Sequence, residues 1–211
     1  HEMLPETGAY KLLDSLGEGV FDLSDHMVLS PKRVTLAPNA KQKIRLALRR
    51  PEDIPPGDHR VHLKFESMPA KKDVKKGAVG DEEFKVAVSI NLNFTIPVIL
   101  REGEVDTQAE IGEISFERNP SNGFLKTQIP VTRLESPFGM LAYLSAYHID
   151  ENGKEEKVGE LLNANIFPEI DSRTFTIGLN KEITGGSLRV VLEDYKKDGT
   201  IYAERTFSLE Q

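Results

Sequence analysis

Apolar residues occupy every second position between Lys85 and Arg101, with small or polar residues between them apart from Pro97 and Ile99, and this pattern constrains the fold more than any other feature. The apolar side chains at every second position are Val86, Val88, Ile90, Leu92, Phe94, Ile96, Val98 and Leu100. Successive side chains of a β-strand point to opposite faces, so the pattern predicts one long strand with this whole set on one face. Pro97 has no N–H, which predicts that the strand lies at the edge of a sheet or carries a bulge.

This strand has two interpretations. The first is the last strand of a β-sandwich, with its apolar face in the core. The second is a strand that lends its edge or its side chains to another protein. A long apolar strand near an edge is otherwise an aggregation hazard, and a homodimer that covers the edge is a reasonable expectation.

Composition excludes several classes of protein. The chain has 211 residues, enough for one large or two ordinary domains. It contains no Cys, which excludes thiol catalysis, cysteine-based zinc sites and disulfides. Its formal net charge of −7 argues against non-specific binding of nucleic acid, which requires a basic surface. No run of 18 apolar residues occurs, so no membrane-spanning helix is expected.

Short alternating segments separated by turn signals predict strands along the whole chain, and no amphipathic helix of three turns is found. In the first half they cover residues 26–30, 34–36, 44–48, 61–65 and 85–101. The acidic, glycine-containing segment 102–106 marks a domain boundary. Beyond it the segments are 111–118, 124–134, 140–149, 155–167, 173–179, 187–194 and 202–209. Such a series is typical of an immunoglobulin-like sandwich. We therefore predict an all-β fold with two sandwiches, in residues 1–101 and 102–211.

No motif predicts catalysis. His59 and His62 are three residues apart, and on a strand this spacing places them on opposite faces, which argues against a shared metal ion. The chain has no Gly-x-Ser-x-Gly, no phosphate-binding glycine-rich loop and no His-Glu-x-x-His. We expect no enzyme activity, no cofactor and no metal site.

Several linked motifs resemble the periplasmic pilus (fimbrial) chaperones of the chaperone–usher pathway. They are Ser30-Pro31-Lys32-Arg33-Val34-Thr35-Leu36-Ala37-Pro38-Asn39, Gln42-Lys43-Ile44-Arg45-Leu46, Arg49-Arg50-Pro51, Ile54-Pro55-Pro56-Gly57, the segment 57–65 and Ile96-Pro97-Val98-Ile99-Leu100-Arg101. The resemblance runs from about Gly8 to Arg101, in the family's order. In the second half it depends on the number of strands and on Glu193-Asp194-Tyr195.

The resemblance implies two immunoglobulin-like domains in a boomerang arrangement, acting in the periplasm of a Gram-negative bacterium. Such chaperones insert the last strand of their first domain into a pilus subunit that lacks a strand, and work with an outer-membrane usher. The donor residues implied here are Val86, Val88, Ile90, Leu92 and Phe94. A register slip of one residue would instead place Ala87, Ser89, Asn91 and Asn93 in the groove.

The sequence departs from the family at two places. The family binds the subunit's C-terminal carboxylate with an arginine on its first strand and a lysine near the closing arginine. We expect the first two strands of domain one to be missing from this sequence. Pro97 stands at the lysine position, which leaves Arg45 or Arg60 as alternatives. The closing arginine is Arg101, and the resemblance implies an interdomain ion pair with Asp194.

Two rival functions remain open. A tandem immunoglobulin-like extracellular adhesion module would have two complete domains and no apolar stripe at an edge. A sugar-binding or hydrolytic sandwich would need an aromatic platform or a carboxylate pair in a cleft. The chain has no Trp and 7% aromatic residues, which makes the latter the least favoured.

Overall fold

The computed structural model describes residues 1–14, 21–68, 92–118, 120, 123–196 and 199–209. Nearly all regular structure in these residues is β-strand, and the remainder is one short 3-10 helix, η1 (Ser24–His26). The predicted all-β fold is therefore confirmed. In the described residues, no helix is long and apolar enough to cross a membrane.

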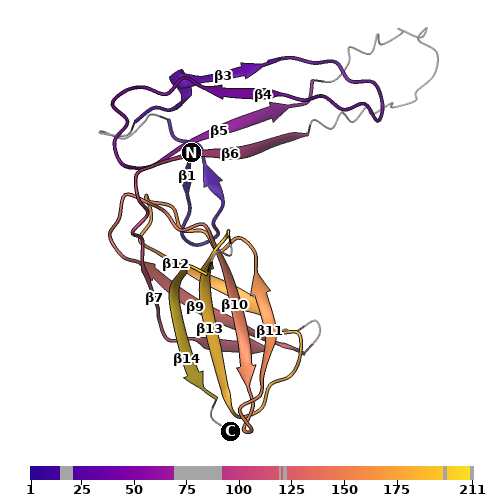
Figure 1. Cartoon of the computed structure of the whole chain (residues 1–211). Coiled ribbons are helices and arrows are strands. Elements are labelled where there is room, and N and C mark those ends of the chain that lie inside the picture. Colours follow the sequence, from indigo (N-terminus) through magenta and orange to yellow (C-terminus); the bar gives the residue numbers. More distant parts are fainter. Residues whose placement is uncertain (15–20, 69–91, 119, 121–122, 197–198, 210–211) are drawn as a thin grey trace, which may run out of the picture.

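The second half of the chain forms a sandwich of two antiparallel sheets (Figure 1). Its strands are β7 (Ala109–Ile111), β8 (Ser115–Arg118), β9 (Leu125–Arg133), β10 (Ala142–Ile149), β11 (Glu155–Leu161), β12 (Ser172–Gly178), β13 (Ser187–Asp194) and β14 (Ile201–Ser208). One sheet has the order β11-β10-β13-β14, and the other has the order β12-β9-β7, with β8 also paired to β9. This arrangement is compatible with an immunoglobulin-like fold.

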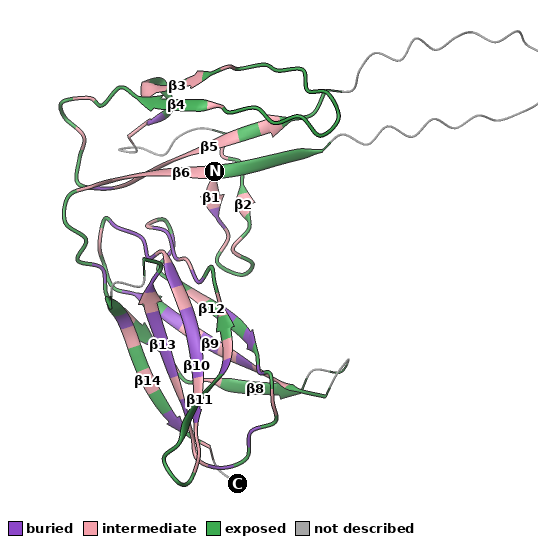
Figure 2. Cartoon of the chain, turned by 45° about the vertical axis from the view of Figure 1, so that its right-hand side comes forward, coloured by how far each residue is buried: buried purple, intermediate pink, exposed green. Residues whose placement is uncertain are grey.

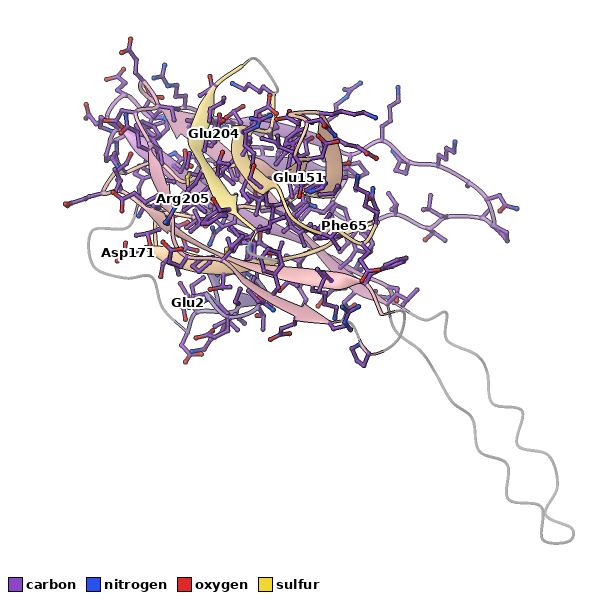
Figure 3. All side chains as sticks on the ribbon, turned by 90° about the horizontal axis from the view of Figure 1, so that it is seen from below. Glu2, Phe65, Glu151, Asp171, Glu204 and Arg205 are labelled. Carbon is purple, nitrogen blue, oxygen red and sulfur yellow. The ribbon has the colours of Figure 1, made fainter. Side chains whose placement is uncertain are left out.

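The core of the sandwich follows from the alternation in its central strands. On β13, Leu188, Val190 and Leu192 are fully buried, and β10 buries Leu144 and Ala146 in the same way. Charged side chains join the sheets from outside this core. Arg205 on β14, labelled in Figure 3, donates to the carbonyl of Ile111 and pairs with Glu113 beside β7.

Pro130 shows how the predicted first strand of this half became two. The proline lies inside β9, which is an interior strand with β12 on one side and β7 and β8 on the other. The partner strand is interrupted beside it: β7 ends at Ile111, and β8 begins at Ser115. At the interruption, Gly112 N–H donates to the Pro130 carbonyl at 2.8 Å. The break lies beside the one residue of β9 that lacks an N–H.

The strands of the first half that the structure describes form three hairpins. They are β1 (Glu2–Met3) with β2 (Tyr10–Lys11), β3 (Met27–Ser30) with β4 (Arg45–Leu48), and β5 (Gly57–Glu66) with β6 (Asn93–Glu102). Figure 1 shows β3–β4 on one side of β5–β6 and the β1–β2 hairpin on the other, between β5–β6 and the sandwich. The segment 34–36, for which the sequence predicted a strand, has none.

The described residues before Glu102 do not confirm a second sandwich. Their buried apolar side chains are Met3 and Leu23. Met3 belongs to the core of the C-terminal sandwich, and Tyr10 packs against that core. The β1–β2 hairpin is thus packed on the end of the sandwich, and the division into two immunoglobulin-like domains stays a prediction.

Candidate functional site

The strand that the sequence singled out forms an apolar ladder with its neighbour. β6 pairs antiparallel with β5 over ten positions and without a register shift. The register places Phe94 opposite Phe65 and Ile96 opposite Leu63. Because Arg60 and His62 contact Tyr10 of β2, alternation puts Leu63 and Phe65 on the face of the hairpin away from β1–β2. The two phenylalanine rings stack, with centroids 4.8 Å apart and planes 11° from parallel. The predicted alternation is therefore present in the described part of this strand.

This ladder is exposed at one end, as Figure 2 shows. Among the residues that the structure describes, β6 is hydrogen-bonded to β5 alone, so its other edge is free. The exposed fraction is 71% for Leu92, 58% for Phe94 and 46% for Ile96. From Pro97 onward the residues of β6 are half-buried. An edge strand with alternate exposed apolar side chains is suited to pair with a strand of another protein.

Two of the predicted donor residues can be placed, and three cannot. Val86, Val88 and Ile90 lie outside the described residues. Leu92 and Phe94 are both exposed, and Leu92 extends the hairpin by one pair because its carbonyl accepts from Ser67 N–H at 3.0 Å.

The other face of β5 contacts the β1–β2 hairpin and the sandwich. The guanidinium of Arg60 lies 4.1 Å from the centre of the Phe167 ring and pairs with Glu169. Glu169 also accepts Met3 N–H at 2.8 Å. A single carboxylate of the sandwich thus binds both β5 and the first hairpin. Arg60, one of the two alternatives for a carboxylate anchor, is committed to this pair, and the other, Arg45, is exposed at the start of β4.

His62 lies beside Arg60 at this contact and has an altered pKa. Its ring is 4.4 Å from the ring of His1 and 4.6 Å from that of Tyr10. Burial and, after it, the Arg60 charge lower the pKa of His62 to about 4, while Glu169 opposes them. The contact therefore favours the neutral ring.

The contact between β5 and the β1–β2 hairpin is expected to weaken in acid, because His62 binds a proton more readily when the hairpin has separated from it. A histidine pKa of about 6.5 in the unfolded chain lies above the folded value, so this stability is complete above about pH 6.5 and is lost as the pH falls toward 4. Screening by solvent limits the effect to about 1 kcal/mol. Hydrogen exchange of the Met3 amide, corrected for intrinsic rates, should show the loss. His62→Gln should flatten the pH dependence, and an unchanged dependence in that variant would contradict the assignment.

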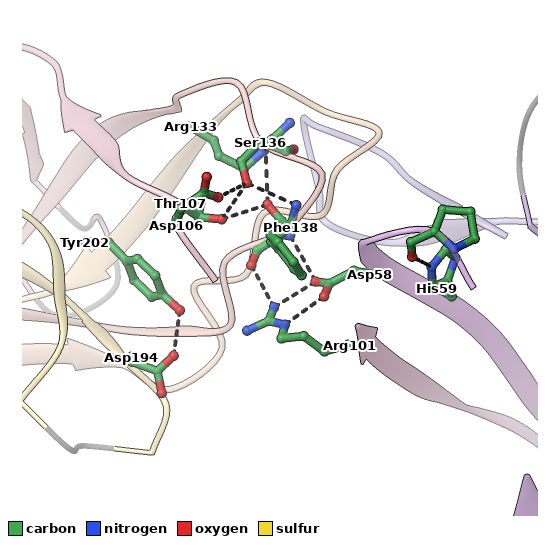
Figure 4. Close-up of polar contacts among 12 residues, drawn as sticks. Asp58, His59, Arg101, Asp106, Thr107, Arg133, Ser136, Phe138, Asp194 and Tyr202 are labelled. Carbon is green, nitrogen blue, oxygen red and sulfur yellow. Dashed lines mark hydrogen bonds and ion pairs between the residues drawn. The ribbon is translucent and has the colours of Figure 1, made fainter. Parts of the chain in front are cut away.

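A second contact joins β5 and β6 to the loop before β10 (Figure 4). Arg101 donates to both carboxylate oxygens of Asp58, each at 2.7 Å, and to the Gly139 carbonyl at 2.8 Å. Gly139 N–H donates back to Asp58 at 2.9 Å, and Asp58 N–H donates to the Pro137 carbonyl at 3.0 Å. The Asp58 side chain is 1% exposed. The hydrogen bonds to Asp58 raise the pKa of Arg101.

Asp194 takes part in this region through a different partner from the one expected. It accepts the Tyr202 hydroxyl at 2.5 Å and Lys196 N–H at 2.8 Å. Burial and the Asp194 carboxylate raise the pKa of Tyr202, and Tyr202 also interacts with Arg101. Among the described residues, the carboxylate that Arg101 binds is Asp58, and Tyr202 interacts electrostatically with both Arg101 and Asp194. A direct Arg101–Asp194 ion pair stays a prediction.

Arg133 is a buried cation that the sequence reasoning missed. It is 5% exposed and donates to the carbonyls of Ser136 at 2.7 Å and Pro168 at 3.1 Å. The carboxylate nearest to it, Asp171, is 3.6 Å away with a side chain 90% exposed. Arg133 therefore connects the loop that contacts Asp58 with the loop that carries Glu169. A sequence signal existed, because an inward position on β9 is normally apolar and this one is an arginine.

Comparison of the chain with protein-family models, curated proteins and solved structures found no match. In the part of the chain that the structure describes, no three His, Asp or Glu side chains form a group that could hold a metal ion. What remains as a candidate site is an edge strand with exposed apolar side chains, fixed to a sandwich by two charged contacts.

Proposed function

We propose that this chain is a periplasmic chaperone that binds pilus subunits by strand donation. In this proposal, β6 and the residues before it complete a subunit sandwich that lacks its last strand. The observation that carries the proposal is the exposure of Leu92, Phe94 and Ile96 on a strand that, within the described residues, is paired on one side only. The periplasmic location and the usher as a second partner follow from the sequence resemblance.

The energetics favour such a contact. An incomplete sandwich exposes an apolar groove, and an edge strand with alternate apolar side chains exposes the complementary surface. Burying each such side chain gives about 1.5–3 kcal/mol, and new backbone hydrogen bonds add to this. Subunit folding supplies the driving force, so the mechanism requires no nucleotide.

The charged contacts behind β6 support donation by holding the strand still. Arg101 binds Asp58 and Gly139 at the end of the hairpin nearest the sandwich, and Arg60 binds Glu169 on its other face. A strand held at one end and exposed at the other is ready to pair, which reduces the entropy lost on binding. The adhesion-module alternative requires no exposed apolar edge, and Leu92 and Phe94 give it no support.

Charged residues in the exposed ladder are expected to abolish subunit binding. The test uses a pilus subunit without its donor extension, co-expressed in a bacterial periplasm with this chain. Leu92→Asp combined with Phe94→Asp should lower recovery of the subunit at least a hundredfold, because two buried apolar contacts are worth at least about 3 kcal/mol. Leu162→Asp, at an exposed leucine of the sandwich, is the matched control and should have no effect. Equal recovery with the double variant would refute strand donation.

A further inference from the structure

The direction of each backbone N–H on β6 can be assigned from two hydrogen bonds at the ends of the hairpin. In an antiparallel pair, opposite residues alternate between hydrogen-bonded and non-hydrogen-bonded positions. Ser67 N–H donates to the Leu92 carbonyl, which makes that pair a hydrogen-bonded one. At the other end, Asp58 is opposite Arg101, and its N–H points away from β6 to Pro137. Both ends give the same alternation, because the register does not shift between them.

This alternation turns the N–H of every second residue of β6 toward its free edge. Counting from Leu92, the residues with outward backbone groups are Asn93, Thr95, Pro97, Ile99 and Arg101. Pro97 has no N–H. It stands opposite His62 in a non-hydrogen-bonded pair, where β5 accepts no hydrogen bond from β6. The proline therefore leaves the β5–β6 ladder intact and removes a donor from the free edge alone.

The surroundings of β6 change at the same residue. Asn93 to Ile96 are exposed on both faces, whereas the residues from Pro97 onward are half-buried. Ile99 packs against the core of the sandwich, and Arg101 is bound by Asp58 and Gly139. The missing donor thus coincides with the point where β6 approaches the rest of the molecule.

We propose that Pro97 ends the part of the β6 edge to which another strand can be added. An added strand pairs with the outward groups of Asn93 and Thr95 and stops before Ile99. The strand that pairs, one from a pilus subunit, rests on the proposed function, whereas the stop at Pro97 rests on the hydrogen-bond directions and the change in burial along β6. The same proline protects the free protein, because a shorter edge is a poorer template for a second copy of this chain.

The first test is the oligomeric state of the free protein, measured by sedimentation equilibrium. Pro97→Ala restores the outward donor and should tighten self-association about tenfold over the wild type. Adding Thr95→Pro to that variant removes an outward donor again and should reverse the gain. Thermal unfolding should change little, because neither position donates to β5. Self-association that does not increase in Pro97→Ala would overturn the proposal.

The second test separates this inference from the proposed function, using subunit recovery as the readout. Thr95→Pro should lower recovery about tenfold through the lost edge donor, and Pro97→Ala should not lower it. Loss of recovery with the Leu92→Asp and Phe94→Asp variant, but none with Thr95→Pro, would overturn pairing at this edge while leaving chaperone function intact. If the double aspartate variant has no effect, the proposed function fails, and the sedimentation result still decides the role of Pro97.

Discussion

Asp58→Ala is expected to lower the free energy of unfolding by about 3 kcal/mol, because it leaves the Arg101 guanidinium without its carboxylate in a partly buried site. Asp58 is nearly inaccessible and accepts from both Arg101 and Gly139 N–H, so the variant also leaves a backbone donor unpaired. Urea unfolding measures the change. Hydrogen exchange should locate it at the Gly139 amide, before any loss of protection in the central strands of the sandwich.

Glu102, the residue after Arg101, provides a matched control for the Asp58 experiment. Glu102 pairs with Arg50 at 2.5 Å, and the Arg50 side chain is 64% exposed. Exposed ion pairs contribute about 0–1 kcal/mol, so Glu102→Ala should change stability far less than Asp58→Ala. Arg101→Ala combined with Asp58→Ala should cost less than the sum of the two single changes, since the remaining charge is no longer buried alone. Equal effects of Asp58→Ala and Glu102→Ala would contradict the structural role of the buried pair.

Arg133→Met is expected to lower the free energy of unfolding by about 3 kcal/mol, because several buried or partly buried carbonyls lose their common donor. The effect should extend to both contacts with the first half of the chain, since Arg133 joins the loop of Gly139 to the loop of Glu169. Exchange of the Gly139 and Met3 amides should therefore accelerate together. The Gly139 amide reports the contact with Asp58, and the Met3 amide reports the contact with Glu169. Faster exchange at both amides would therefore show that Arg133 supports both contacts.

Asp171 offers the control for Arg133. Its carboxylate is 3.6 Å from the guanidinium, and its side chain is almost fully exposed. If the carbonyls rather than this carboxylate bind Arg133, Asp171→Ala should change stability by less than about 0.5 kcal/mol. A large effect of Asp171→Ala, or unchanged Gly139 and Met3 exchange in Arg133→Met, would contradict the role assigned to Arg133.

The strands could be predicted where one sheet face is buried. Residues 187–194 alternate between apolar and polar side chains, and β13 has those bounds. Prediction was weaker where both faces of a strand meet solvent. The segment 34–36 alternates in the same way, yet the exposed fractions of Val34 and Leu36 are 40% and 51%, and no strand forms there. Exposure alone does not decide the outcome, because β4 is exposed throughout and still pairs with β3. Local alternation therefore leaves the outcome open for segments whose apolar face is not covered.

The site was predictable in part. The alternation before Arg101 and the proline within it indicated an edge strand, and β6 is an edge strand among the described residues. The partner of Arg101 was missed because it depends on the register of β5 and β6, which places Asp58 opposite Arg101. Pairing Phe65 with Phe94 from the sequence gives the same register, because two phenylalanines often pair across antiparallel strands. The contacts of Arg133 lie in loops, which alternation does not predict.

Hydrogen exchange of the Thr95 amide tests the central claim most directly, because this N–H points to the free edge of β6. In the free protein, Thr95 should exchange rapidly, whereas Phe94 and Ile96, at hydrogen-bonded positions opposite β5, should be protected. After co-purification with a strand-deleted pilus subunit, Thr95 should become protected about as strongly as its neighbours. Thr95 that is protected already in the free protein, or that stays unprotected in the complex, would contradict strand addition at this edge.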